Sequence, residues 1–98
     1  MKLWIDDVRP APDGYVWCTT VNQAKFMITH EESSDPVELL DLDHDAGRYA
    51  EFGGDYIKIL DFIEETGRSY PIRIHSMNAV GRQNMLAICE RNGWKVVK

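Results

Sequence analysis

Three short polar segments of this sequence carry the side-chain types that metal-dependent phosphate chemistry requires. Carboxylates held close together repel one another unless a proton or a cation lies between them. Their oxygen atoms are hard ligands that suit Mg²⁺ or Mn²⁺, and a bound magnesium ion usually keeps water and a substrate phosphate in its coordination shell. We therefore expect a Mg²⁺ or Mn²⁺ site whose ligands are Asp6, Asp7, Asp41 and Asp43. The alternative, in which these acids are solvated loop residues, stays open.

Two histidines within these segments are candidates for proton transfer. His44 lies between Asp43 and Asp45, and His75 is followed by Ser76. An imidazole titrates near neutral pH, so we expect His44 and His75 to act as general acid and base, in an order that the sequence does not assign. Asp43 and Asp45 could bind the metal or orient these histidines. A histidine at a strand end is also often a hydrogen-bonded structural residue, and that interpretation stands beside the catalytic one.

Two arginines are candidates for binding the phosphate. A guanidinium group donates two parallel hydrogen bonds to phosphate oxygens, which suits Arg9 and Arg82 to this role. Arg9 could equally pair with a nearby aspartate, and Arg82 could lie on a solvated helix face. The expected ligand is a small phosphate-containing molecule or a nucleotide.

Each polar segment follows an apolar run of the kind that forms a buried strand. We expect strands at 3–5, 15–19, 37–42, 71–76 and 94–98. Amphipathic helices separate the later strands, with Thr20, Asp55 and Asn78 as N-caps and a loop between Asp43 and Gly54. This order predicts a mainly parallel sheet covered on both faces. Because ligands bind outside the carboxyl ends of such strands, the polar segments should meet at one edge.

The bulk properties indicate one soluble domain over residues 1–98. The chain has 98 residues, of which 44% are hydrophobic and 28% charged, as in ordinary globular proteins. A net charge of −5 disfavours long nucleic acids as partners, because they require a basic surface. Neither a signal peptide nor an apolar membrane span is present, so we expect a cytoplasmic monomer without a membrane partner. Cys18 and Cys89 lie in apolar segments and are expected to be reduced.

Several of these segments resemble the signature positions of two-component receiver domains. The matching segments are Leu3-Trp4-Ile5-Asp6-Asp7, Leu39-Leu40-Asp41, Ile74-His75-Ser76 and Val97-Lys98. The resemblance implies a flavodoxin-like, three-layer α/β sandwich with a five-stranded sheet in the order 2-1-3-4-5. It further implies that Asp6 and Asp7 bind the metal and that Asp41 accepts a phosphoryl group. Ser76 and Lys98 would contact that group.

The sequence also departs from ordinary receivers. A proline-rich loop follows the first strand in place of the first receiver helix, and the last receiver helix is absent from these 98 residues. With the added histidines, the segments Asp6-Asp7-Val8-Arg9-Pro10, His75-Ser76-Met77-Asn78 and Gly81-Arg82 resemble the divergent branch described as cyclic-phosphate processing receiver domains. This resemblance implies an enzymatic role.

Three functions remain open on these grounds. The first is a metal-dependent phosphoesterase that hydrolyses small cyclic phosphates or nucleotide-derived phosphates. The second is a stand-alone receiver phosphorylated on Asp41, and the third is a catalytically silent module that binds phosphate or metal. Asp41-Leu42-Asp43 also resembles the nucleophile motif of haloacid-dehalogenase-type phosphatases, but that family needs a larger core domain.

Overall fold

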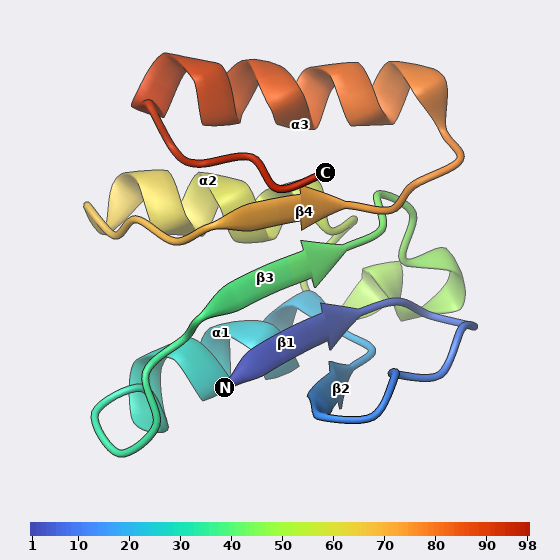
Figure 1. Cartoon of the computed structure of the whole chain (residues 1–98). Coiled ribbons are helices and arrows are strands. Elements are labelled where there is room, and N and C mark those ends of the chain that lie inside the picture. The colour runs from blue at the N-terminus through green and yellow to red at the C-terminus, as the bar shows by residue number, and fades with distance from the viewer.

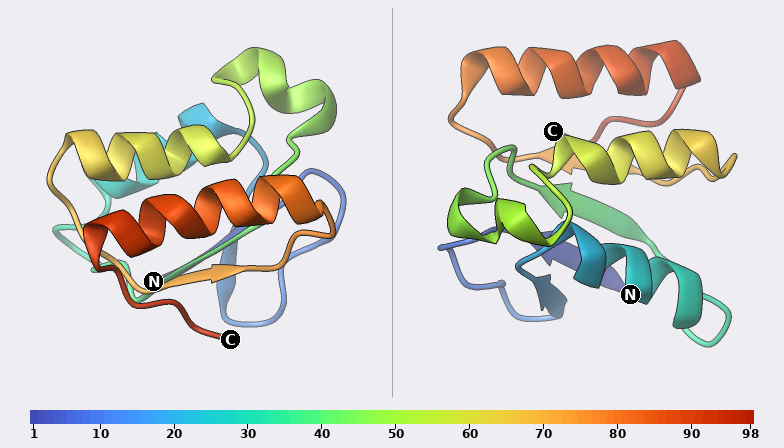
Figure 2. Two further views of the ribbon diagram at one scale, coloured as in Figure 1. Left: turned by 90° about the horizontal axis from the view of Figure 1, so that it is seen from above. Right: turned by 180° about the vertical axis from the view of Figure 1, so that it is seen from behind.

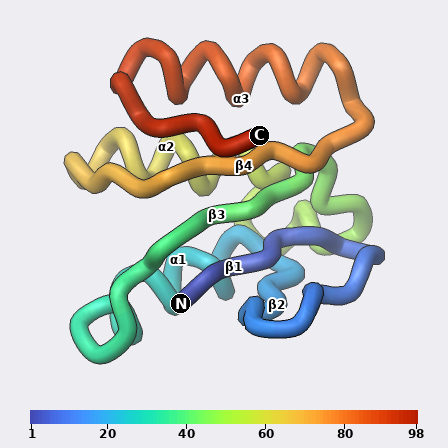
Figure 3. Tube along the Cα trace, in the orientation of Figure 1, coloured from blue at the N-terminus to red at the C-terminus, as the bar shows by residue number.

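The computed structural model describes all residues from Met1 to Lys98 and contains one parallel four-stranded sheet in the order β2-β1-β3-β4 (Figure 1). The strands are β1 (Lys2–Ile5), β2 (Tyr15–Cys18), β3 (Leu39–Leu42) and β4 (Ile72–Ile74). The helices are α1 (Val21–His30), α2 (Ile57–Glu65) and α3 (Ala79–Asn92), with a 3-10 helix η1 (Gly47–Phe52). The expected parallel α/β sheet is confirmed, and its chain path is traced in Figure 3.

The expected fifth strand at residues 94–98 does not form. Only Val96 pairs with β4, as an isolated bridge to Ile72. The backbone N–H of Ile72 donates to Lys95, and that of Val97 donates to Ile72. No other residue of 94–98 pairs with β4, so this single bridge is not extended into a ladder. The five-stranded sheet is therefore corrected to four strands.

All three helices and η1 lie on one face of the sheet, which leaves the other face without a helical layer (Figures 1 and 2). Residues 8–14 form a loop between β1 and β2, where Pro10 and Pro12 are incompatible with a helix interior. No helix follows Asn92. The three-layer sandwich predicted from the sequence is therefore wrong, and the domain has two layers. We call the uncovered side the open face.

Side chains alternate between the two faces along each strand. The helical face is apolar and buries seven strand residues, which are Leu3, Ile5, Cys18, Leu40, Leu42, Ile72 and Ile74. The open face carries a row of four residues in register across the strands, namely Trp17, Trp4, Asp41 and Arg73. We call these four residues the register row. They place aromatic and charged groups on the side of the sheet that no helix covers.

Helix ends follow the sequence signals closely. The Thr20 hydroxyl accepts a hydrogen bond from the backbone N–H of Gln23, and the Asn78 side chain accepts one from Gly81. Gly93 ends α3 with a φ of 68°, which favours glycine. Asp55 is the exception, because its carboxylate accepts from the backbone N–H of Ala46 and does not cap α2.

The core is a single cluster of 22 buried residues between the sheet and the helices. It includes Ile59, Leu60 and Ile63 of α2, Met85 and Ile88 of α3, and both cysteines, which are free thiols. Burial raises the pKa of Cys18 to about 11, so this thiol is inert at neutral pH. No helix of the chain has both the length and the apolar character needed to cross a membrane.

Candidate metal and phosphate site

Three carboxylates gather at the carboxyl edge of the sheet. Asp6 and Asp7 follow β1, and Asp43 follows β3, with one oxygen of each within 4.8 Å of the others. Asp6 is fully buried, whereas the other two are partly exposed. Asp43 reaches this level because its backbone N–H donates to Ile5, which continues the β1–β3 pairing beyond the strand end. We call Asp6, Asp7 and Asp43 the acid cluster.

Asp6 is held in place by the proline-rich loop. Its Oδ1 accepts hydrogen bonds from the backbone N–H groups of Val8 and Arg9, both at 2.9 Å. The Nε of Arg9 donates to Oδ2, also at 2.9 Å. Burial alone would raise the pKa of Asp6, but these hydrogen bonds, one from His75 and the Arg9 charge together lower it. Asp6 is therefore ionised at neutral pH.

Arg9 joins two members of the acid cluster. Its Nη2 lies 3.2 Å from Oδ2 of Asp43 and 3.4 Å from the backbone oxygen of His75. The indole N–H of Trp4 donates to the backbone oxygen of Arg9 at 2.8 Å, which fixes the loop against β1. Arg9 thus balances part of the negative charge of the acid cluster. This is the pairing with aspartate that the sequence left open as an alternative to phosphate binding.

Asp7 is the member of the acid cluster without a cationic partner. Burial and the like charges of Asp6, Asp43 and Asp45 raise its pKa, against a smaller opposing backbone hydrogen bond. Its Oδ2 lies so close to Gly47 that a Cβ there would come within 2.6 Å. A crowded set of carboxylates with excess negative charge fits a hard divalent cation such as Mg²⁺ or Mn²⁺.

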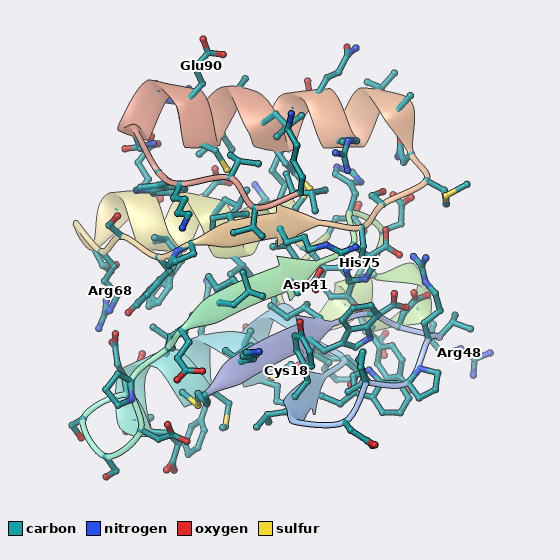
Figure 4. The ribbon with its side chains drawn as sticks, viewed as in Figure 1. Cys18, Asp41, Arg48, Arg68, His75 and Glu90 are labelled. Carbon is teal, nitrogen blue, oxygen red and sulfur yellow. The ribbon has the colours of Figure 1, made fainter.

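His75 lies between two buried carboxylates. Its Nδ1 is 2.7 Å from Oδ1 of Asp41, and its Nε2 is 2.9 Å from Oδ2 of Asp6. The imidazole stacks on Trp4 with ring centroids 3.9 Å apart, and only 7% of its side chain is exposed. Figure 4 places the labelled His75 and Asp41 together at the open face. Both ring nitrogens are occupied, so His75 is built to hold Asp6.

Asp41 is not part of the acid cluster. It lies inside β3 and pairs with Trp4 of β1, which is two residues before Asp6. Its carboxylate is 3.3 Å and 3.0 Å from Nη1 of Arg73 and also contacts His75. The side chain is 1% exposed. The structure therefore places the buried Asp41 carboxylate in an ion pair with the half-exposed Arg73, outside the acid cluster.

A second polar group adjoins the acid cluster. One ligand atom each of His44, Asp45 and Asp55 lies within 4.8 Å of the others. The Nδ1 of His44 is 2.8 Å from Oδ1 of Asp45, while its Nε2 has no hydrogen-bond partner. The hydrogen bond from His44, helped by Asn78, lowers the pKa of Asp45. The imidazole packs against Gly81, where a Cβ would come within 2.4 Å of it.

The remaining predicted phosphate ligands are placed differently. The Ser76 hydroxyl is buried and accepts a hydrogen bond from the backbone N–H of Asn78 at 3.0 Å. Arg82 donates to the backbone oxygen of Ile74. Lys98 is exposed and makes no hydrogen bond or ion pair. None of these three contacts the acid cluster.

Sequence reasoning missed Arg73 and the glycines beside Asp7 and His44. Arg73 precedes His75 by two positions in a strand, a spacing that puts both side chains on one face, so the signal was present. The closeness of Gly47 to Asp7 and of Gly81 to His44 depends on how distant segments meet, and no local pattern reveals it.

Taken together, a parallel sheet with paired acids after its first strand and a further acid after its third defines a receiver-like α/β domain. The family model for the cyclic-phosphate processing Receiver domain matches residues 1–91, and the chain belongs to this family. The resemblance predicted from the sequence is confirmed. Searches among curated proteins and among solved structures each find no match.

Proposed function

We propose that this domain hydrolyses small cyclic phosphates, including nucleotide-derived ones, with a divalent metal bound by Asp6, Asp7 and Asp43. The observation that carries the proposal is the gathering of these three carboxylates at the sheet edge, with Asp7 lacking any cation of its own. The family name points to the same substrate class. When bound, Mg²⁺ or Mn²⁺ would neutralise charge on the phosphate oxygens and acidify a bound water.

His44 is the residue best suited to move a proton. Opening a cyclic phosphodiester forms a bond from the water oxygen to phosphorus and breaks one ring P–O bond. The water gives up a proton and the departing alkoxide takes one. Asp45 holds Nδ1 of His44 at 2.8 Å, so Nε2 is free to accept and then deliver that proton. Asp45 thus orients His44 in the way that a carboxylate orients the catalytic histidine in many hydrolases.

His75 takes a positioning role in this proposal. Its two nitrogens already contact Asp41 and Asp6, and the ring is covered by Trp4. Arg9 contributes in a similar way, because it pairs with Asp6 and Asp43 at once. These contacts suit His75 and Arg9 to holding the metal ligands in place, and they leave His75 without a free nitrogen to carry a second proton.

Turnover of 2′,3′-cyclic AMP in the presence of Mn²⁺, followed by ³¹P NMR, tests the proposal. We expect conversion to a phosphomonoester by the wild-type protein and a loss of about 100-fold or more in His44→Ala. His30 lies exposed on α1, so His30→Ala is the matched control and should retain full turnover. If His44→Ala turned over the substrate as fast as the wild type, His44 would have no part in the mechanism. If the wild type bound Mn²⁺ but showed no turnover, the proposed hydrolase activity would be contradicted.

Receiver phosphorylation is the second candidate, and one observation shifts its acceptor. Asp43 lies partly exposed in the acid cluster, whereas Asp41 is buried between Arg73 and His75. If the domain accepts a phosphoryl group, Asp43 is the better nucleophile. Incubation with acetyl phosphate and Mg²⁺ should then add one phosphoryl mass that Asp43→Asn abolishes and Asp41→Asn leaves in place. An adduct lost only in Asp41→Asn would reverse this assignment.

A further inference from the structure

A pocket opens beside the acid cluster, between the end of β1 and the start of η1. Its lining residues are Asp7, Val8, Arg48 and Tyr49. Asp7 belongs to both the pocket and the acid cluster, so a molecule bound at the cluster would extend directly into this space. The pocket therefore continues the proposed site.

Arg48 is the one arginine of this chain without a partner. Arg9, Arg68, Arg73 and Arg91 pair with carboxylates, and Arg82 donates to a backbone oxygen. Arg48 makes no ion pair or hydrogen bond, even though it lines the same pocket as Asp7. Figure 4 labels it at the end of the molecule toward which β1 and β3 run, opposite the end that carries Arg68. In an acidic chain, this guanidinium is free for an external anion.

The other walls of the pocket are suited to an organic group. Val8 is 73% exposed, and Tyr49 is partly buried against the core. These two side chains add apolar surface to the pocket that Asp7 and Arg48 also line. A ligand that fills the pocket would have phosphate at the cluster, an apolar or planar middle and a second anionic group. A nucleotide with two separate phosphates has this composition.

We propose that Arg48 is a specificity-determining residue that binds a second phosphate, a monoester, on a nucleotide whose cyclic phosphate lies at the acid cluster. The inference rests on the proposed function, because it assumes that the cyclic phosphate binds there. A guanidinium binds phosphate through two parallel charge-assisted hydrogen bonds, which a lysine could not reproduce.

Calorimetric binding of two nucleotides in the presence of Mn²⁺ tests this assignment. To keep the probes intact, every protein in this test, including the reference called wild type, also carries His44→Ala, which removes the proposed turnover. The probes are adenosine 2′,3′-cyclic phosphate and the same nucleotide with an added 5′-phosphate. We expect the 5′-phosphate to tighten binding to the wild-type protein about tenfold. Arg48→Ala should lose that gain and bind both probes with the affinity of the unphosphorylated one. Arg68→Ala, which alters an arginine paired with Glu32, is the matched control and should behave as wild type.

The outcomes separate this inference from the function on which it rests. Equal affinity of the wild type for the two probes, or a 5′-phosphate preference that persists in Arg48→Ala, overturns the role of Arg48 and leaves the proposed function intact. Failure of both probes to bind, with Mn²⁺ bound, overturns both proposals. A preference present in wild type and Arg68→Ala and absent in Arg48→Ala supports the assignment.

Discussion

The Nδ1 of His75 lies 2.7 Å from Oδ1 of Asp41, in the middle of a chain of contacts that runs from Arg73 to Asp43. On its other side the imidazole meets Asp6, which in turn pairs with Arg9. Both histidine contacts are hydrogen bonds only when the ring carries two protons or one carboxyl carries one. The network therefore links the open face of the sheet to the acid cluster through buried charge.

Asp41→Asn should destabilise the protein by about 1–3 kcal/mol, because it removes the buried carboxylate that Arg73 and His75 both contact and leaves His75 with Asp6 as its remaining anionic partner. Urea unfolding followed by tryptophan fluorescence measures the change. Asp61→Asn is the control, because Asp61 is partly exposed and pairs only loosely with Lys58 at 3.9 Å. It should cost less than about 0.5 kcal/mol. Equal midpoints for the two variants would contradict a buried-pair role.

Asp7→Asn should stabilise the metal-free protein at neutral pH by on the order of 0.5–1 kcal/mol. Burial and like charges raise the folded-state pKa of Asp7, so its ionised form opposes folding above that pKa. The advantage should vanish as pH falls and the wild-type carboxyl becomes protonated in both states. Thermal unfolding across pH 3–7 measures this difference (a range set about the ordinary Asp pKa of ~3.9).

The same substitution should reverse its effect when metal is added. Mn²⁺ at a hundredfold excess over its dissociation constant should stabilise the wild-type protein by about 2.7 kcal/mol. Asp7→Asn should lose most of this gain. A variant that is more stable without metal and less stable with it would be the signature of a binding residue, whereas equal stabilisation by Mn²⁺ would exclude Asp7 as a ligand.

Gly47→Ala should weaken Mn²⁺ binding by about tenfold, because a methyl group would come within 2.6 Å of Oδ2 of Asp7 and displace it. Gly67→Ala provides the control for backbone strain. Both glycines have positive φ, 56° and 69°, but nothing lies within 4 Å of a Cβ at Gly67. Both variants should lose about 1 kcal/mol of stability. Only Gly47→Ala should change metal affinity, and an equal change in both would point to a general effect.

Gly81→Ala should have opposite effects on stability in two backgrounds. In the wild type, the new methyl group would come within 2.4 Å of the His44 ring and force it away from Asp45. In His44→Ala that obstacle is gone, so alanine's better helix propensity should stabilise α3 by up to about 1 kcal/mol. A double-mutant cycle in urea measures the coupling. Additive effects would show that the ring does not rest on Gly81.

Local sequence signals predicted most of the fold because helix starts and buried strands are set by neighbours in the chain. Thr20 and Asn78 act through groups a few residues away, and the structure confirms both as N-caps. The fifth strand depended on pairing with β4, a segment distant in the chain, and only Val96 forms that pairing. The absence of a second helical layer was not predicted, because Trp4 and Asp41 lie in mostly apolar runs, which are typical of strands buried on both faces.

The distinction between Asp41 and Asp43 depends on strand register. Both lie near the end of β3, and their spacing puts both on one face. Register pairs Asp41 with Trp4, which brings Asp43 level with Asp6, roughly 6–7 Å further along the strand. Register is set by contacts between segments distant in the chain, so the sequence alone could predict an acidic edge but not which aspartate completes it.

Trp4, Asp41 and Arg73 of the register row, together with His75, link β1, β3 and β4 through side-chain contacts in addition to the backbone pairing. Trp4 on β1 supports His75, which Asp41 on β3 fixes, while Arg73 on β4 closes over the same carboxylate. A strand cannot detach from this arrangement without exposing a buried charge. The amide protons of β1, β3 and β4 should therefore exchange with deuterated solvent in one concerted opening. Those of β2 should exchange earlier, because this edge strand contributes no buried charge and its side-chain link is one hydrogen bond, from Trp17 to the backbone oxygen of Asp6.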